Sequence, residues 1–141
     1  MGSENLAMIA SRNSWKAVQA KDKQAWLDLM AEDVCLEDPI GVALTNPDGK
    51  GVRGKEAVSA FYDKNMAPAT IRVEAHESHA SSATNEAGHV LTLTTTLPNG
   101  VVSRVRGVFT YRTNDEGKIT NLRGYWTMEA MEFQQPGETA G

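Results

Sequence analysis

Apolar residues recur at helical spacing in three stretches of the first half of the chain, and each stretch predicts a helix with one apolar side. The repeat in the first stretch, residues 4–20, consists of Leu6, Ile9, Ala10, Ala17 and Val18. Asp22 is a good N-cap for the second helix, whose apolar stripe extends to Met30. The third helix is predicted from about residue 55 to residue 66, before Pro68 ends it.

From residue 70 onward, apolar and polar residues mostly alternate, which is the period of a β-strand. The predicted strands cover residues 70–79, 87–97, 101–113 and 118–132. One face of the third strand carries Val105, Gly107, Phe109 and Tyr111, and one face of the last carries Leu122, Gly124, Trp126 and Met128. Helices first and antiparallel strands afterwards are typical of an α+β fold. We therefore predict one domain in residues 1–133, a curved sheet wrapped by three helices, followed by a polar tail at 134–141.

Asp38 lies at the end of an additional strand between the second and third helices. Val34, Leu36 and Asp38 share one face, because successive side chains of a strand alternate. Pro39 then stops the strand, since it has no N–H to donate. A buried carboxylate is costly unless it is hydrogen-bonded, which makes Asp38 a candidate functional acid. The alternative is a solvated acid in a turn, because Asp-Pro commonly opens turns.

Charge and composition argue against several classes of function. The net charge of -4 argues against nucleic acid as a partner, because phosphate binding requires clustered Lys and Arg. No apolar run approaches the length of a membrane span, and the N-terminal residues lack the features of a signal peptide. We therefore expect a cytoplasmic protein with no membrane partner. His76 and His79 point to opposite faces of a predicted strand, which argues against a metal site.

The stretch Glu37-Asp38-Pro39-Ile40-Gly41 resembles the signature of bacterial ketosteroid isomerases. Phe61-Tyr62 in the third helix and the stretch from Leu122 to Trp126 are similar to aromatic positions of the same family. The resemblance covers roughly residues 5–130 and extends most closely to mycobacterial steroid-isomerase-like proteins. It implies the cone-shaped α+β barrel of the superfamily that includes nuclear transport factor 2 and the SnoaL-like proteins, a fold also described as cystatin-like.

The resemblance also implies a reaction. In the family, the aspartate that matches Asp38 moves a proton from C4 to C6 of a 3-oxo-Δ5-steroid. The oxygen of the intermediate dienolate is held by a tyrosine hydroxyl and a protonated aspartic acid. We accordingly expect a small apolar steroid-like ligand, no cofactor or metal, and a homodimer formed through the outer face of the sheet.

Both of the family's oxyanion donors are missing from their usual positions. The tyrosine position falls on Ser14, and the acidic position falls on Gly107, where we expect the missing side chain to leave empty volume. Loss of one such donor typically lowers turnover by about 10²–10³. The candidate replacement donors are Tyr62, Ser14 and Tyr125. We favour Tyr62, because the matching tyrosine supports the donor network in the family.

The pocket is expected between the third helix and the last two strands. Its predicted lining is Phe61, Val105, Gly107, Phe109, Leu122, Gly124, Trp126 and Met128. The glycine-rich stretch 41–54 predicts a loop that covers the pocket mouth. The leading hypothesis is a ketosteroid Δ5-Δ4 isomerase with Asp38 as base, weakened or altered by the missing donors. The alternatives are a non-catalytic binder of steroid-like apolar ligands and a related polyketide cyclase-type enzyme.

Overall fold

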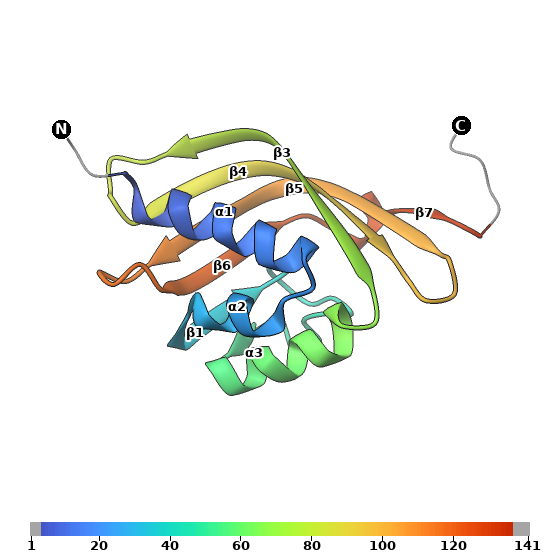
Figure 1. The fold of residues 1–141 in the computed structure, drawn as a ribbon. Helices are drawn as coiled ribbons and strands as arrows, with labels where there is room; N and C mark the ends of the chain where they lie inside the picture. Colours follow the sequence, from blue (N-terminus) through green and yellow to red (C-terminus); the bar gives the residue numbers. More distant parts are fainter. Residues whose placement is uncertain (1–3, 137–141) are drawn as a thin grey trace.

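The computed structural model describes residues 4–136, in which three helices precede most of a seven-stranded sheet (Figure 1). The helices are α1 (Leu6–Gln19), α2 (Lys23–Asp28) and α3 (Lys55–Phe61), with a π-helical turn at Tyr62–Met66 after α3 and a 3-10 turn at Met128–Ala130. The strands are β1 (Met30–Glu37), β2 (Val52–Arg53), β3 (Thr70–Ala80), β4 (Glu86–Thr96), β5 (Val102–Thr113), β6 (Ile119–Tyr125) and β7 (Glu132–Gln134).

The strands are ordered β2-β1-β6-β5-β4-β3, and β7 pairs with the beginning of β5. The pairing of β1 with β6 is parallel, and the other neighbouring pairs are antiparallel. The long strands β3, β4 and β5 curve around the helices (Figure 1). Within the described residues the edge strands β2 and β3 do not pair, so the cone is open. The predicted α+β architecture is therefore confirmed.

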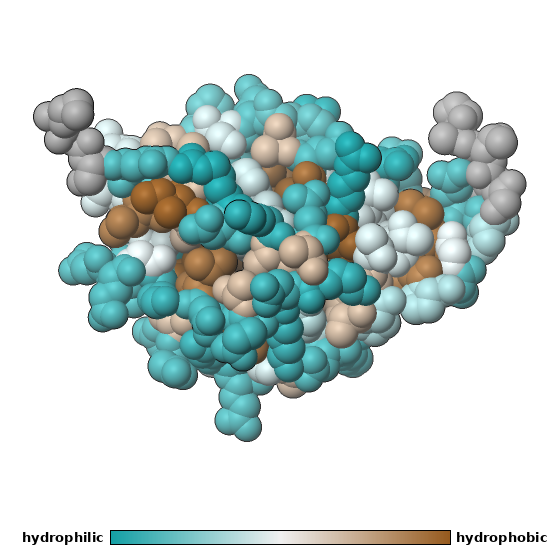
Figure 2. All heavy atoms as spheres, viewed as in Figure 1, coloured by the Kyte–Doolittle hydropathy of each residue, from teal (hydrophilic) through white to brown (hydrophobic). Residues whose placement is uncertain are grey.

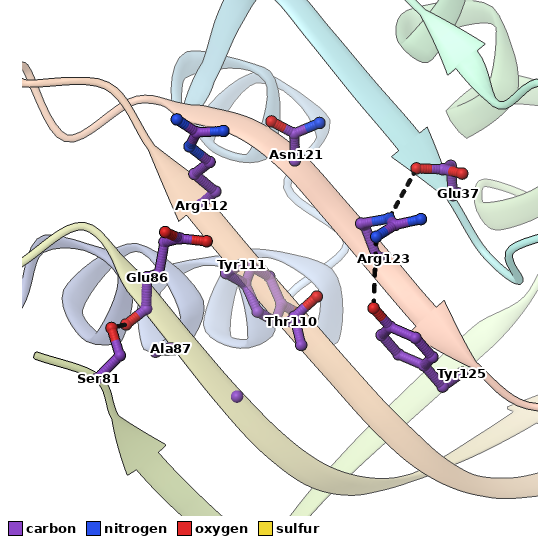
Figure 3. Close-up of a pocket in the computed structure, with 11 residues that line it drawn as sticks. Glu37, Ser81, Glu86, Ala87, Thr110, Tyr111, Arg112, Asn121, Arg123 and Tyr125 are labelled. Atoms are coloured by element: carbon purple, nitrogen blue, oxygen red, sulfur yellow. Dashed lines mark hydrogen bonds and ion pairs between the residues drawn. The ribbon is translucent and has the colours of Figure 1, made fainter. Parts of the chain in front are cut away.

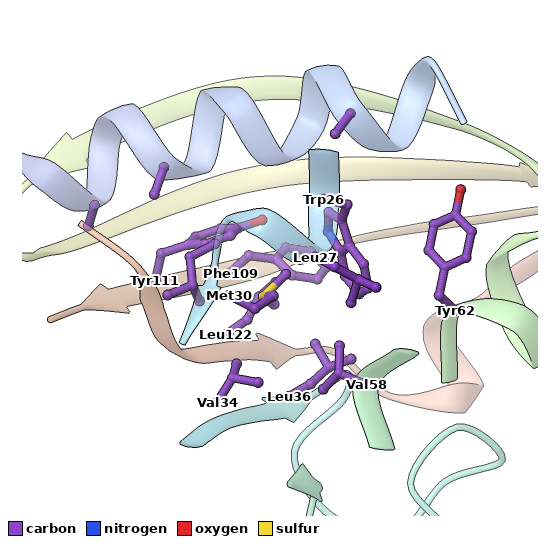
Figure 4. Packing of buried hydrophobic residues seen from close by; sticks show 14 of the residues in the cluster. Trp26, Leu27, Met30, Val34, Leu36, Val58, Tyr62, Phe109, Tyr111 and Leu122 are labelled. Atoms are coloured by element: carbon purple, nitrogen blue, oxygen red, sulfur yellow. The ribbon is translucent and has the colours of Figure 1, made fainter. Parts of the chain in front are cut away.

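The helices cover the concave face of the sheet, with α1 lying across β3, β4 and β5 (Figure 1). The side chain of Asn5 caps α1 by accepting a hydrogen bond from Met8 N at 3.0 Å, and it donates to Ala83 O at 3.0 Å. The predicted cap of α2 is confirmed, because Asp22 accepts from Ala25 N at 3.0 Å. The inner faces of the helices and strands meet in one apolar core (Figure 4).

The predicted end of the second helix is wrong, because Met30 begins β1. The carbonyl of Leu29 accepts a hydrogen bond from Ile119 N at 2.8 Å. This bond to the first residue of β6 draws the chain into the sheet directly after α2. The apolar spacing of this segment is therefore compatible with the start of a strand as well as with the end of a helix.

The predicted strand 118–132 is also wrong in its second half, because β6 ends at Tyr125. The hydroxyl of Thr127 then accepts from Ala130 N at 3.2 Å and caps the 3-10 turn. After the turn, β7 pairs with the first residues of β5. Gln134, the first residue of the predicted tail, belongs to β7, and residues 137–141 of that tail lie outside the described residues.

The surface seen in Figure 2 is mostly hydrophilic, with hydrophobic side chains gathered in separate places among polar ones. Among residues 4–136, no helix combines the length and the apolar character that crossing a membrane requires. The cytoplasmic location remains a prediction. The described residues also contain no group of three His, Cys, Asp or Glu that could hold a metal ion. His76 instead forms a hydrogen bond with Thr92 at 2.7 Å.

Candidate active site

A cavity of about 340 Å³ lies between the concave face of the sheet and the helices. Its walls are mainly aliphatic and aromatic. The residues predicted for the pocket that do line it are Phe61, Val105, Phe109, Leu122 and Trp126. Polar groups reach the cavity at a few points, of which Asp38 is one. The cavity therefore suits a mainly apolar molecule that carries one or two oxygen atoms.

Asp38 follows the last residue of β1 and is held beside the end of β6. The parallel pairing of β1 with β6 brings Asp38 next to Gly124, and Ile40 N donates a hydrogen bond to Gly124 O at 2.9 Å. The hydroxyl of Thr45 donates to the main-chain carbonyl of Asp38. The backbone on both sides of the acid is therefore fixed, while its side chain lines the cavity.

The carboxylate of Asp38 has a single hydrogen bond recorded among the described side chains. Trp126 Nε1 donates to Asp38 Oδ1 at 2.8 Å. Burial raises the pKa of Asp38 above its usual value, and the hydrogen bond from Trp126 opposes this rise. The protein surrounds the acid, but the cavity leaves the carboxylate accessible to a molecule bound there. The inward placement agrees with the strand-face prediction and not with a solvated turn.

Gly124 faces inward but makes room for the acid instead of lining the cavity. A Cβ atom at this position would lie 2.9 Å from Trp126 Nε1, 3.0 Å from Asp38 Oδ1 and 3.0 Å from Phe109 Cε2. Such contacts are too short for an ordinary side chain. The absence of a side chain at Gly124 is thus what allows the indole and the carboxylate to meet.

Gly107 also does not line the cavity, and the empty volume predicted there is absent. A Cβ atom on Gly107 would lie 2.7 Å from Tyr125 O and 3.0 Å from Trp126 Cβ. The chain leaving β6 crosses the inner side of Gly107 and fills that space with backbone. An acidic side chain at residue 107 would have no room in this arrangement.

A second polar group reaches the cavity where α1 crosses β5. Tyr111 and Ser14 line the cavity there. Trp15 Nε1 donates to Tyr111 Oη at 2.9 Å, and Trp26 Nε1 donates to Ser14 Oγ at 3.2 Å. Tyr111 was not among the predicted donors, although it shares a strand face with Val105. That shared face was the signal in the sequence that could have identified it.

The other two candidate donors lie outside the cavity. Tyr62 is buried in the core, where its ring packs against Trp26 with centroids 5.5 Å apart. Figure 4 shows Tyr62 and Tyr111 well apart, with Trp26 between them in this view. Tyr125 is 49% exposed, and its hydroxyl accepts from Arg123 Nη1 at 3.4 Å on the outer side of the sheet. The placement therefore does not support Tyr62 or Tyr125 as a donor to a ligand in the cavity.

The outer face of β4, β5 and β6 has its own hollow, of about 510 Å³, which Figure 3 shows with Tyr125 at its edge. Its walls are polar and carry both charges, including Arg112 and Glu86. Arg123 Nε donates to Glu37 Oε1 at 2.9 Å across one side. Asp38 does not reach this hollow. The smaller apolar cavity, which holds the buried acid, is therefore the candidate site.

The cavity is completed by residues that strand alternation does not predict. Met131 lines it, whereas the predicted Met128 lies in the 3-10 turn and does not. Leu44 and Thr45, from the loop that follows Asp38, also line it. Leu44 is 81% exposed, so this loop stands at the cavity mouth, as predicted for the stretch 41–54.

This arrangement can support proton transfer at carbon. A carboxylate faces a mainly apolar cavity, and a hydroxyl group lies elsewhere in the same cavity. Such a pair can remove a proton from carbon next to a carbonyl and stabilise the charge that develops on oxygen.

Comparisons with known proteins give a consistent result. The model of the SnoaL-like domain family matches residues 12–122. The chain is similar to a Δ5-3-ketosteroid isomerase from Mycobacterium sp., with 55% identity over 92% of this chain and 99% of that chain and a TM-score of 0.91. No curated protein matches the chain.

Two further solved structures concern steroids. One is RV0760c from Mycobacterium tuberculosis in complex with estradiol-17beta-hemisuccinate, with 51% identity over 92% of this chain and 100% of that chain and a TM-score of 0.90. The other is a computationally designed 17-OHP binder, with 48% identity over 93% of this chain and 100% of that chain and a TM-score of 0.91. The resemblance to mycobacterial ketosteroid isomerase-like proteins is thereby confirmed.

Proposed function

The chain belongs to the SnoaL-like domain family, and from that premise we propose that it is a ketosteroid isomerase-type enzyme with Asp38 as its base. The reaction moves a proton from C4 to C6 of a 3-oxo-Δ5-steroid. Asp38 takes the C4 proton, the electron pair of that C–H bond forms a C3=C4 double bond, and the π pair of the carbonyl moves onto the 3-oxygen, which gives a dienolate. The neutral acid then returns the proton at C6. The carbonyl at C3 re-forms, and the remaining double bond lies between C4 and C5, conjugated with it.

The observation that carries this proposal is the carboxylate of Asp38 in the wall of an apolar cavity. Trp126 occupies Oδ1, which leaves Oδ2 as the oxygen that takes the proton. The raised pKa of Asp38 makes its carboxylate a stronger base than an exposed aspartate. An apolar ligand displaces water from the carboxylate and strengthens this effect.

The walls of the cavity support a flat apolar ligand. Phe61, Val105, Leu122 and Trp126 come from different elements and face the same space. The related RV0760c structure holds a steroid ester, and the related designed protein is a 17-OHP binder. A steroid is therefore the ligand class that we propose for this chain.

The proposal is tested by incubating the protein with 5-androstene-3,17-dione and following the absorbance of the conjugated enone. Asp38→Asn is expected to lower kcat by about 10²–10⁴, because a positioned base is lost. Asp33→Asn is the matched control, since Asp33 is an exposed acid on the same strand. No conversion by the wild-type protein, or equal rates for wild type and Asp38→Asn, would contradict the proposed reaction.

A non-catalytic steroid binder is the second candidate, and one observation favours it. Ser14 and Gly107 stand where the resemblance places the two oxyanion donors, and Gly107 has no room for an acidic side chain. This alternative predicts tight binding of a steroid without conversion of the enone. Binding measured by calorimetry alongside the absorbance assay distinguishes the two functions.

We also propose that two copies associate through the outer face of the sheet. Val108 and Tyr125 lie opposite each other on β5 and β6 and are 43% and 49% exposed. Such an exposed apolar pair is typical of an interface when it belongs to a larger patch. Val108→Lys should shift sedimentation towards the monomer. Val42→Lys, at an exposed loop position, should not, and a monomeric wild-type protein would contradict the dimer.

A further inference from the structure

Tyr111 brings a hydroxyl group into the cavity at the point where α1 crosses β5. The residue is 4% exposed and lines the cavity. Its inward direction follows from the alternation of β5, on which Val105 and Phe109 also face inward. The chain has three tyrosines, and the other two, Tyr62 and Tyr125, do not line the cavity.

The hydrogen bonds around Tyr111 leave its proton for another partner. An indole N–H only donates, so Trp15 Nε1 uses the tyrosine oxygen as an acceptor at 2.9 Å. Trp15 is itself held by an edge contact with His89, with ring centroids 4.7 Å apart. The hydroxyl of Ser14 accepts from Trp26 Nε1 at 3.2 Å and keeps its own proton, with which it can donate to Tyr111 as Trp15 does.

The electrostatic environment keeps Tyr111 protonated. Burial raises its pKa above the usual range, the hydrogen bonds from Trp15 and Ser14 oppose the rise, and the charge of Asp38 adds to it. Asp38 and Tyr111 both line the one cavity, so a single ligand can contact both groups. Tyr111 is therefore a neutral donor that faces the same cavity as the candidate base.

We propose that the Tyr111 hydroxyl donates a hydrogen bond to the oxygen on the A ring of the steroid, and that Trp15 orients this hydroxyl. The steroid class and any turnover rest on the proposed function, but recognition of the oxygen requires only binding. Tyr111 thus replaces the family's oxyanion donors, which are missing at Ser14 and Gly107. In the isomerase reaction, its proton stabilises the dienolate oxygen without leaving the tyrosine.

The first test compares two ligands, an estrogen-type phenol and its 3-deoxy analogue, by calorimetry. The wild-type protein is expected to bind the phenol at least about tenfold more tightly, which is the effect of one good hydrogen bond. Tyr111→Phe is expected to lose most of this preference while it still binds the deoxy analogue. Tyr125→Phe removes the same atom outside the cavity and should keep the preference. Equal losses for both ligands in Tyr111→Phe would mean a structural role and would overturn the proposal.

The second test does not depend on the folding of Tyr111→Phe. Wild-type protein labelled with carbon-13 at the tyrosine ζ position has three tyrosine signals to assign. Tyr62→Phe and Tyr125→Phe each remove one signal and thereby identify that of Tyr111. The phenol should move the Tyr111 signal, and the deoxy analogue should move it much less. An unmoved Tyr111 signal at saturating phenol would overturn the proposal.

The outcome of these tests separates Tyr111 recognition from isomerase activity. A phenol preference that needs Tyr111, without enone conversion by wild type, would support the donor and reject the isomerase. Conversion that Asp38→Asn abolishes but Tyr111→Phe leaves unchanged would support the base and reject the donor. If both proposals hold, Tyr111→Phe should lower kcat by about 10²–10³, whereas Trp15→Phe should have a smaller effect.

Discussion

Replacing Asp38 with asparagine should make the folded protein more stable above neutral pH. The acid is surrounded by protein, and Trp126 donates its one recorded side-chain hydrogen bond, at 2.8 Å. An asparagine oxygen can accept the same hydrogen bond, while its amide carries no charge. The substitution therefore removes the cost of a buried anion and retains the contact that holds the side chain in place.

The expected gain follows from two opposing contributions. A buried ion typically costs several kcal/mol, and one hydrogen bond to a charged group returns about 1.5–3 kcal/mol. The net cost of the Asp38 anion is then on the order of 1–2 kcal/mol, because the cavity gives the carboxylate some contact with water. Asp38→Asn should raise the free energy of unfolding by that amount once Asp38 is fully ionised.

The sign of the pH dependence follows from the raised pKa of Asp38. The folded state holds the proton more tightly than the unfolded state, so the wild-type protein loses stability as pH rises through the native pKa. Below the ordinary pKa of aspartate, about 4, Asp38 is protonated in both states. The advantage of Asp38→Asn should therefore be small near pH 4 and should grow to a plateau at higher pH.

Urea unfolding followed by tryptophan fluorescence at pH 4, 7 and 9 measures this advantage. Asp33→Asn is the control for an exposed acid on the same strand and should change stability by less than about 0.5 kcal/mol. A destabilising effect of Asp38→Asn at pH 9 would refute the reasoning. So would a gain of equal size at all three pH values, because it could not arise from the charge.

Three further predictions concern other residues of the cavity and the core. Gly124→Ala should lower kcat/KM at least about tenfold in the enone assay, because the new methyl group displaces the base. The pKa of His89 is lowered to about 4, chiefly by burial, so its burial should cost about 3 kcal/mol of stability as pH falls from 7 to 4. Denaturation of His89→Gln across this range should show a correspondingly flatter pH profile. Met131→Ala should weaken steroid binding measured by calorimetry, whereas Met128→Ala should change it less than about twofold, since only Met131 lines the cavity.

The fold was largely predictable because hydrophobic periodicity and local signals agree along most of the chain. Asp22 predicted the start of α2, and the alternation beyond residue 70 predicted β3, β4 and β5. The end of β6 was missed because the alternation continues through Trp126, although the chain there leaves the sheet. Thr127 was the available local signal, since its hydroxyl caps the 3-10 turn.

The candidate site was predictable only where it depends on the direction of side chains in a strand. Asp38, Val105 and Phe109 reach the cavity as the alternation of their strands predicts. Tyr62 does not, because its ring, at the start of the π-helical turn, packs against Trp26 in the core. Met131 could not be predicted, because its position depends on how the chain returns after the 3-10 turn.

Gly107 shows why a face prediction alone cannot locate empty space. Its position on the inner face of β5 was predicted from alternation, but the backbone of Tyr125 lies 2.7 Å from where its Cβ would be. A side chain that donates from residue 107 is therefore incompatible with the path of the chain after β6. A donor to the ligand oxygen must come from another wall of the cavity. Tyr111 and Ser14 are the hydroxyl groups that this chain places there beside tryptophan donors.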